Sequence, residues 1–241
     1  MEQEPVRQET DNVLNGDNDD DDLPMLSSHA LAALREFMEE QNQLNVDEGS
    51  TGETGEKVTL ITEDWRLSQF WYDPLTAETV AMEVIDLLAN NSHPFPRVAC
   101  IACPTLYAYI KKMEPDVSVQ LLEYDKRFGQ YGRDFIYYDY NQPEELPSEL
   151  KHAFQVVVAD PPYLSKECLE KVQQTISFLR THAQSNVLLL TGEVQKDRAA
   201  ELLGLHPCGF KPQHSSKLGN EFRLFTDYDP GTRLGGWELE K

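Results

Sequence analysis

The sequence has no long apolar run and few cysteines, and both shortages limit its class. No stretch of the 241 residues approaches the roughly 20 apolar residues of a membrane-spanning helix. The first residues are acidic and contain neither an apolar signal segment nor an Arg-rich transit segment. Four cysteines without dense spacing fit a reducing compartment better than a secreted scaffold. We therefore expect a cytoplasmic protein without a membrane segment, and its 40% hydrophobic content suffices for one α/β domain.

Basic side chains are also scarce. The net charge is −21; residues 1–57 hold 16 acidic and 3 basic side chains, and the rest of the chain holds 26 and 18. Nucleic-acid binding depends on basic patches that neutralise phosphates, so this balance argues against a DNA or RNA partner. It suits a basic protein partner instead.

Composition divides the chain into three expected regions. Residues 1–26, with the acidic run 19–22, are typical of a solvated disordered tail. Residues 27–57 are expected to hold a short helix at 28–38, with one apolar face, and a linker rich in Gly, Thr and Glu. The helix either docks on the folded domain or awaits a partner. Residues 58–241 are the expected folded domain.

From residue 58 onward the pattern alternates strands and helices. We expect strands at 97–102, 117–122, 135–138, 154–159, 186–190, 205–210 and 221–226, and helices at 73–89, 105–112, 166–179 and 194–203. Such alternation predicts a doubly wound, mostly parallel α/β sheet with helices on both faces and an antiparallel terminal pair.

The tetrapeptide Asp160-Pro161-Pro162-Tyr163 directly follows the apolar run 154–159. Two prolines prevent the strand from continuing, so Asp160 is held at the carboxyl end of a buried strand, where open α/β sheets bind their ligands. A carboxylate, the turn carbonyls and a flat ring can hold an amino nitrogen with its lone pair aimed at an electrophile. We interpret Asp160, Pro161 and Tyr163 as catalytic residues; the alternative is a strand that merely ends in a proline turn.

Further acidic residues stand near the ends of two other strands. A nucleoside ligand lies across the ends of the first strands in such a sheet, so Glu123 is expected to hydrogen-bond ribose hydroxyls, with Asp125 a second candidate. An exposed strand-end carboxylate is the alternative for Glu123. Asp139 could accept a hydrogen bond from an adenine amino group, or it could simply cap a turn beside Asn141.

A glycine-rich loop is missing after the first expected strand, where the chain reads Ala-Cys-Ile-Ala-Cys-Pro-Thr over 99–105. The small residues Ala102 and Cys103 still allow close approach of a cofactor, and the N–H groups of the next helix remain available. Cys100 and Cys103 form a C-x-x-C pair without a second pair for zinc, so we expect no metal site. A redox dithiol is the alternative to two small buried residues, which we favour.

Several segments together resemble the eukaryotic elongation factor 1A lysine methyltransferase 1 family, over roughly residues 27–229. They are 28–34, 67–72, 123–128, 135–141, 160–164 and 220–223. The resemblance implies the seven-stranded class I methyltransferase fold over 58–241, S-adenosylmethionine as the methyl donor, and a lysine of translation elongation factor 1A as the acceptor. The Asp-Pro-Pro-Tyr element is also typical of adenine-N6 DNA methyltransferases, with which the family was first grouped.

The resemblance also suggests a mechanism, and two alternative functions remain open. The acceptor lysine must lose a proton before attack, and Asp160, close to both cofactor and acceptor, would orient the neutral amine. Phe70, Trp71 and Tyr72 could form a lid over cofactor or substrate, or they could be core residues. A nucleic-acid adenine methyltransferase and a non-catalytic binding module remain the alternative functions. We expect a monomer.

Overall fold

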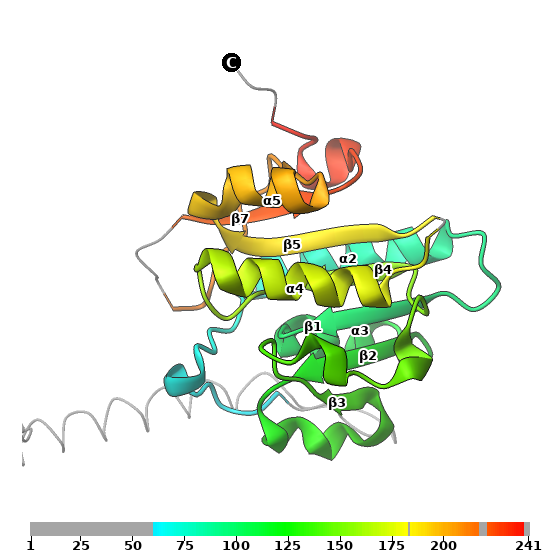
Figure 1. The fold of residues 1–241 in the computed structure, drawn as a ribbon. Coiled ribbons are helices and arrows are strands. Elements are labelled where there is room, and N and C mark those ends of the chain that lie inside the picture. The colour runs from blue at the N-terminus through cyan, green and yellow to red at the C-terminus, as the bar shows by residue number, and fades with distance from the viewer. Residues whose placement is uncertain (1–59, 183, 217–220, 239–241) are drawn as a thin grey trace, which may run out of the picture. The chain divides into compact units, whose positions relative to one another are not determined.

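The computed structural model describes residues 60–182, 184–216 and 221–238, so the expected tail, the helix at 28–38 and the linker lie outside the described residues. Seven strands form one sheet in the order β3-β2-β1-β4-β5-β7-β6 (Figure 1). Strands β1 to β5 are parallel to one another, and β7 is antiparallel to β5 and β6. This is the class I methyltransferase fold, as predicted. The strands are β1 (Arg97–Ile101), β2 (Ser118–Glu123), β3 (Phe135–Tyr137), β4 (Val156–Ala159), β5 (Asn186–Gly192), β6 (His206–Pro207) and β7 (Phe222–Thr226).

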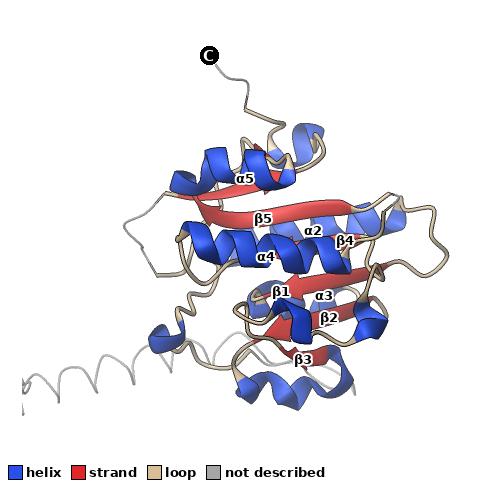
Figure 2. Cartoon of the chain, in the orientation of Figure 1, coloured by secondary structure: helices blue, strands red, loops and turns tan. Residues whose placement is uncertain are grey.

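Helices cover both faces of the sheet. In Figure 2, α4 (Lys166–Leu179) and α5 (Lys196–Leu203) lie in front of it, and α2 (Pro74–Ala89) and α3 (Pro104–Met113) lie behind it. Successive residues of the strands point to opposite faces, so each strand contributes to two cores. Val156 and Val158 belong to the core that contains buried residues of α2 and α3, whereas Val157 belongs to the core on the α4 side.

Two helices begin directly after residues whose side chains cap them. The carboxylate of Asp73 accepts a hydrogen bond from the Thr76 N–H at 2.7 Å, and Pro74 occupies the first helical position of α2. Ser165 caps α4 in the same way, since its Oγ accepts from the Cys168 N–H at 3.2 Å. Local capping chemistry therefore determines where the helices on both faces begin.

The last part of the sheet differs from the prediction. The strand expected at 205–210 is only His206–Pro207, and the helix expected at 194–203 begins at Lys196 after a 3-10 turn. Pro207 has no N–H to donate to a ladder. Beyond it, Gly209 lies against the backbone of Gly235; a Cβ on Gly209 would lie 2.7 Å from the Gly235 carbonyl oxygen. The Cys208 N–H still donates to the Leu224 carbonyl of β7 at 2.8 Å, but Gly209 and Phe210 donate instead to the C-terminal segment.

The chain makes its first turn over the sheet edge without a glycine. Ala102 follows β1 in the left-handed region, with a φ of 53°, and its N–H donates to the Leu122 carbonyl at 2.9 Å. This turn takes the chain from β1 into α3, which begins at Pro104. An alanine therefore adopts the conformation that glycine adopts with less strain.

Residues 71–73, directly before α2, pair with residues 213–215, which lie far away in the sequence. Tyr72 forms an antiparallel bridge with His214, the Ser215 N–H donates to the Trp71 carbonyl at 2.8 Å, and the Asp73 N–H donates to the Gln213 carbonyl at 3.0 Å. These contacts fix residues 71–73 beside 213–215.

Among the helices of the described residues, none is both long and apolar enough to cross a membrane.

The left-handed turn makes Ala102 a testable position. We expect Ala102→Gly to raise the free energy of unfolding by up to about 1 kcal/mol, because the strain of a Cβ at positive φ is removed. Ala102→Val should lower it by more than about 1 kcal/mol, because a β-branched residue tolerates this region poorly. Urea denaturation measures both. Ala99→Gly in β1 is the control, and it should destabilise; equal destabilisation by Ala102→Gly would contradict the prediction.

Candidate active site

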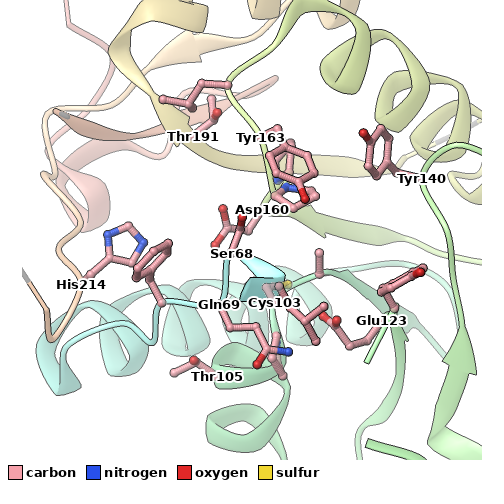
Figure 3. Close-up of a pocket in the computed structure, with 18 of the residues that line it drawn as sticks. Ser68, Gln69, Cys103, Thr105, Glu123, Tyr140, Asp160, Tyr163, Thr191 and His214 are labelled. Atoms are coloured by element: carbon pink, nitrogen blue, oxygen red, sulfur yellow. The ribbon is translucent and has the colours of Figure 1, made fainter. Parts of the chain in front are cut away.

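A cavity of about 710 Å³ opens at the carboxyl edge of the parallel strands (Figure 3). Nearly all residues that the sequence assigns to a site line it. These are Phe70, Trp71, Tyr72, Ala102, Cys103, Glu123, Asp139, Asp160, Pro161 and Tyr163. The parallel sheet brings them together because the ends of β1, β2 and β4 lie at one edge.

The lining of the cavity is acidic. Glu123, Asp139, Asp160 and Glu221 contribute carboxylates, and no lysine or arginine occurs among the described residues that line it. Glu221 pairs with Lys211 and Arg223 at 3.1 and 3.4 Å. The other three carboxylates form no ion pair within the described residues, and such carboxylates favour ligands that carry positive charge. A phosphate group would find no cationic side chain in this lining.

Asp160 stands at the end of β4, at the centre of the cavity in Figure 3. Its N–H donates to the Ile101 carbonyl at 3.0 Å, which extends the β1–β4 ladder by one residue. One carboxylate oxygen accepts the Tyr72 hydroxyl at 2.7 Å. Burial raises the pKa of Asp160 to about 7, a shift that the Tyr72 hydrogen bond opposes and the Glu123 charge increases. Tyr72 thus holds one oxygen and leaves the other available to a ligand.

Tyr72 is suited to that task because its hydroxyl stays protonated. The residue is buried, and burial together with the Asp160 charge raises the pKa of its hydroxyl well above the ordinary value. Trp71 also contacts the core: its indole N–H donates to the Ile61 carbonyl at 3.0 Å, and its ring meets Phe128 edge-on at 6.2 Å. The three aromatic residues of 70–72 therefore all line the cavity, and Trp71 in addition packs against the core.

Glu123 and Asp125 differ sharply in their surroundings. Glu123 lines the cavity and is 6% exposed, and burial raises its pKa to about 7. Asp125 is not among the residues that line the cavity. Its carboxylate accepts from Gln69 Nε2 at 3.0 Å and pairs with Arg127 at 2.6 Å. Burial acts to raise the pKa of Asp125, but these partners outweigh it and lower the pKa. The structure thus brings Glu123, and not Asp125, to the other site residues.

Asp139 caps a turn, as one of its two interpretations predicted, and it also faces the cavity. Its carboxylate accepts the Asn141 N–H at 2.8 Å and so caps the turn after β3, and the residue also lines the cavity. Next to it, Tyr140 meets Tyr163 edge-on, with ring centroids 5.9 Å apart. Tyr163 is 47% exposed, so this pair forms an open rim above Asp160 (Figure 3).

Of the C-x-x-C pair, Cys103 lines the cavity and Cys100 does not. Cys100 and Cys103 are free thiols that are 0% and 2% exposed, and burial raises the pKa of Cys103 well above its ordinary value. A buried, protonated thiol is a poor redox group. Among the described residues, no group of three or more His, Cys, Asp or Glu side chains is placed to hold a metal ion.

Other lining residues were not assigned to the site from the sequence. His214 and Phe222 line the cavity because residues 213–215 pair with 71–73 and because β7 begins beside Gly192. Thr191, at the end of β5, also lines it, and its buried Oγ1 has no hydrogen-bond partner among the described residues. Strand β5 and its apolar pattern were predicted, but a polar residue at its end carried no motif.

The chain is similar in sequence to one family model and to several known proteins. A family model described as "Probable N6-adenine methyltransferase" matches residues 63–230. EEF1A lysine methyltransferase 1 of Mus musculus is 46% identical over 217 residues, which cover 89% of this chain and 97% of that protein. The Homo sapiens protein of the same name is 42% identical over 221 residues, 91% of this chain and 99% of that one. A protein-lysine N-methyltransferase of Caenorhabditis elegans is 37% identical over 217 residues, 88% of this chain and 97% of that protein.

The two carboxylates predict a pH-dependent stability of the ligand-free protein. The folded-state pKa of Glu123 and that of Asp160 are both raised to about 7, so the folded state binds these protons more tightly than the unfolded state. Their stabilising contribution is full below about pH 4 and is lost as pH rises through about 7. We expect Glu123→Gln to reduce the loss of unfolding free energy between pH 5 and 8 by about 1–3 kcal/mol.

Denaturant titrations at the two pH values measure this difference. Glu149→Gln is the control, because Glu149 is exposed and lies outside the cavity. An equal effect of both substitutions would contradict the assignment of the pH dependence to the cavity.

Proposed function

We propose that this protein methylates a lysine of translation elongation factor 1A. The chain belongs to the family described as probable N6-adenine methyltransferase and also to the EEF1A lysine methyltransferase 1 family. S-adenosylmethionine is the methyl donor. Residues 58–241 are the proposed catalytic domain, since they include all residues that line the cavity. We further propose that the enzyme acts as a monomer in the cytoplasm.

The acidic cavity around Asp160 is the observation that favours lysine over adenine. Both acceptors are amines, and Asp160 could orient either. A nucleic-acid enzyme must also hold phosphates and extract a base from its stack. The described lining offers four carboxylates and no basic side chain, which suits an acceptor that arrives as an ammonium ion. Relatives at 37–46% identity bear names of lysine methyltransferases, in agreement with this choice.

The residues present fit the donor. S-adenosylmethionine carries a positive sulfonium, and the carboxylates of the cavity complement it. Glu123, at the end of β2, is proposed to accept hydrogen bonds from the ribose hydroxyls, and Asp139, at the end of β3, from the adenine amino group. Ala102 and Cys103 would lie beneath the donor, where their small side chains permit close approach.

The chain's own residues would prepare the acceptor. A lysine ammonium has no lone pair, and burial beside positive charge lowers its pKa so that water can take the proton. The oxygen of Asp160 that Tyr72 leaves available, together with the carbonyl of Pro161, would then orient the neutral amine. When bound, the donor supplies a methyl group whose bond to sulfur breaks as the nitrogen lone pair attacks, leaving a neutral thioether. Tyr163 would cover the lysine stem.

The direct test compares possible acceptors. The protein is incubated with labelled S-adenosylmethionine and either purified elongation factor 1A or nucleic acid, and mass spectrometry locates the methyl groups. We expect label on a lysine of the factor. Label on adenine would support the nucleic-acid alternative, and failure to bind S-adenosylmethionine would support the non-catalytic binding module.

Removing the Asp160 carboxylate tests the orienting role. We expect Asp160→Asn and Asp160→Ala to lower kcat for the elongation factor by about 10²-fold or more, because a misplaced amine loses its in-line geometry. The affinity for S-adenosylmethionine should stay within a few-fold. Single-turnover kinetics and calorimetry measure the two quantities. Full activity of either variant would disprove the assignment.

Glu123 predicts a pH-dependent affinity for the donor. Its pKa of about 7 means that the carboxyl group ionises between pH 6 and 8, so the affinity for a cationic ligand should rise over this range. Glu123→Gln should weaken binding about 10-fold or more and reduce the pH dependence, since hydrogen bonds to a charged group contribute about 1.5–3 kcal/mol. Calorimetry at pH 6 and at pH 8 measures the affinity of the wild-type protein and of the variant. Unchanged affinity would instead assign the ribose to Asp125.

A further inference from the structure

Four rings gather at one end of the cavity, between the start of β7 and the segment before α2. Phe70, Tyr72, His214 and Phe222, here called the aromatic subsite, all line the cavity. His214 lies at their centre: its ring centroid is 4.1 Å from that of Phe222, 5.9 Å from that of Tyr72 and 6.1 Å from that of Phe70. The arrangement is a wall of rings that faces the same space as Asp160.

Backbone pairing fixes the positions of these rings. Tyr72 and His214 are bridge partners, and hydrogen bonds of 2.8 and 3.0 Å flank the bridge on either side. Phe222 is the first residue of β7 and pairs with Gly192 at the end of β5. A site held by ladder contacts needs little reorganisation when a ligand arrives.

The imidazole of His214 is uncharged in this wall. Burial lowers the pKa of His214 to about 4, an effect that the nearby Asp73 charge only partly opposes. Among the described residues, neither ring nitrogen has a hydrogen-bond partner. At neutral pH the subsite therefore offers flat, neutral faces, and its polar atoms remain available.

The subsite and the proposed donor half of the cavity lie on opposite sides of Asp160. Figure 3 places His214 to the left of Asp160 and Glu123 to its right. Tyr72 joins the subsite to Asp160 directly, because its ring belongs to the wall and its hydroxyl donates to the carboxylate at 2.7 Å. A side chain lying along the wall would thus reach the free oxygen of Asp160 with its tip.

We propose that the aromatic subsite receives the side chain of the acceptor lysine, with its alkyl stem against the rings and its amine at Asp160. This inference rests on the proposed function and specifies its acceptor site. The chemistry agrees, since a four-carbon stem packs well on aromatic faces, and the Asp160 carboxylate complements the arriving ammonium. A neutral imidazole adds no charge to repel it.

Kinetics of His214 variants test the subsite. We expect His214→Ala to raise KM for the elongation factor at least tenfold and to leave the Kd of S-adenosylmethionine within twofold. His214→Phe, which keeps a neutral ring, should recover most of the loss. A histidine outside the cavity is the matched control: the exposed His206 stacks on Trp237 at 4.4 Å, and His206→Ala should change neither quantity. A changed Kd with unchanged KM would overturn the proposal.

A second measurement does not depend on the identity of the protein substrate. n-Butylamine reproduces the lysine stem and amine, and saturation-transfer NMR should detect its contact with wild-type protein and a weaker signal with His214→Ala. If butylamine binds in this way but the factor is not methylated, the subsite stands and the proposed function fails. If the factor is methylated but His214→Ala gives the wild-type butylamine signal and the wild-type KM, the proposed subsite is wrong.

Discussion

The hydrogen bond from the Tyr72 hydroxyl to the Asp160 carboxylate joins the parts on which the site depends. It spans 88 positions of sequence, from the segment before α2 to the end of β4, with an oxygen–oxygen distance of 2.7 Å. Without this donor, a carboxylate whose pKa burial raises to about 7 would be protonated more readily and free to rotate. The bond therefore sets both the direction and the charge of the group that faces the acceptor.

The same cavity shows a conflict between stability and function. Burying Glu123 and Asp160 without a basic partner disfavours their ionised forms. A lysine or arginine in the lining would relieve this cost, but it would also repel a sulfonium and an ammonium. Asp125, which does have a basic partner in Arg127, is by contrast not part of the lining. The acids without basic partners are thus the ones that a cationic ligand could neutralise.

Sequence reasoning predicted what local chemistry determines. The start of α2 followed from its capping residue and proline, and the strands that end near Glu123, Asp139 and Asp160 followed from apolar runs. The short β6 was not predicted, because the contact between Gly209 and Gly235 is tertiary. Long-range pairing likewise brought His214 to Tyr72 across a separation that no motif records.

The ambiguity of the Asp-Pro-Pro-Tyr element has a physical basis that these distant residues address. Asp160, Pro161 and Tyr163 can present any amine that has a free lone pair, so they do not discriminate lysine from adenine. Discrimination requires groups that contact the rest of the acceptor: phosphate-binding cations for a nucleotide, or an apolar wall for an alkyl stem. The described lining has the second and lacks the first. Acceptor choice is thus encoded in the aromatic side of the cavity, outside the motif that identifies the chemistry.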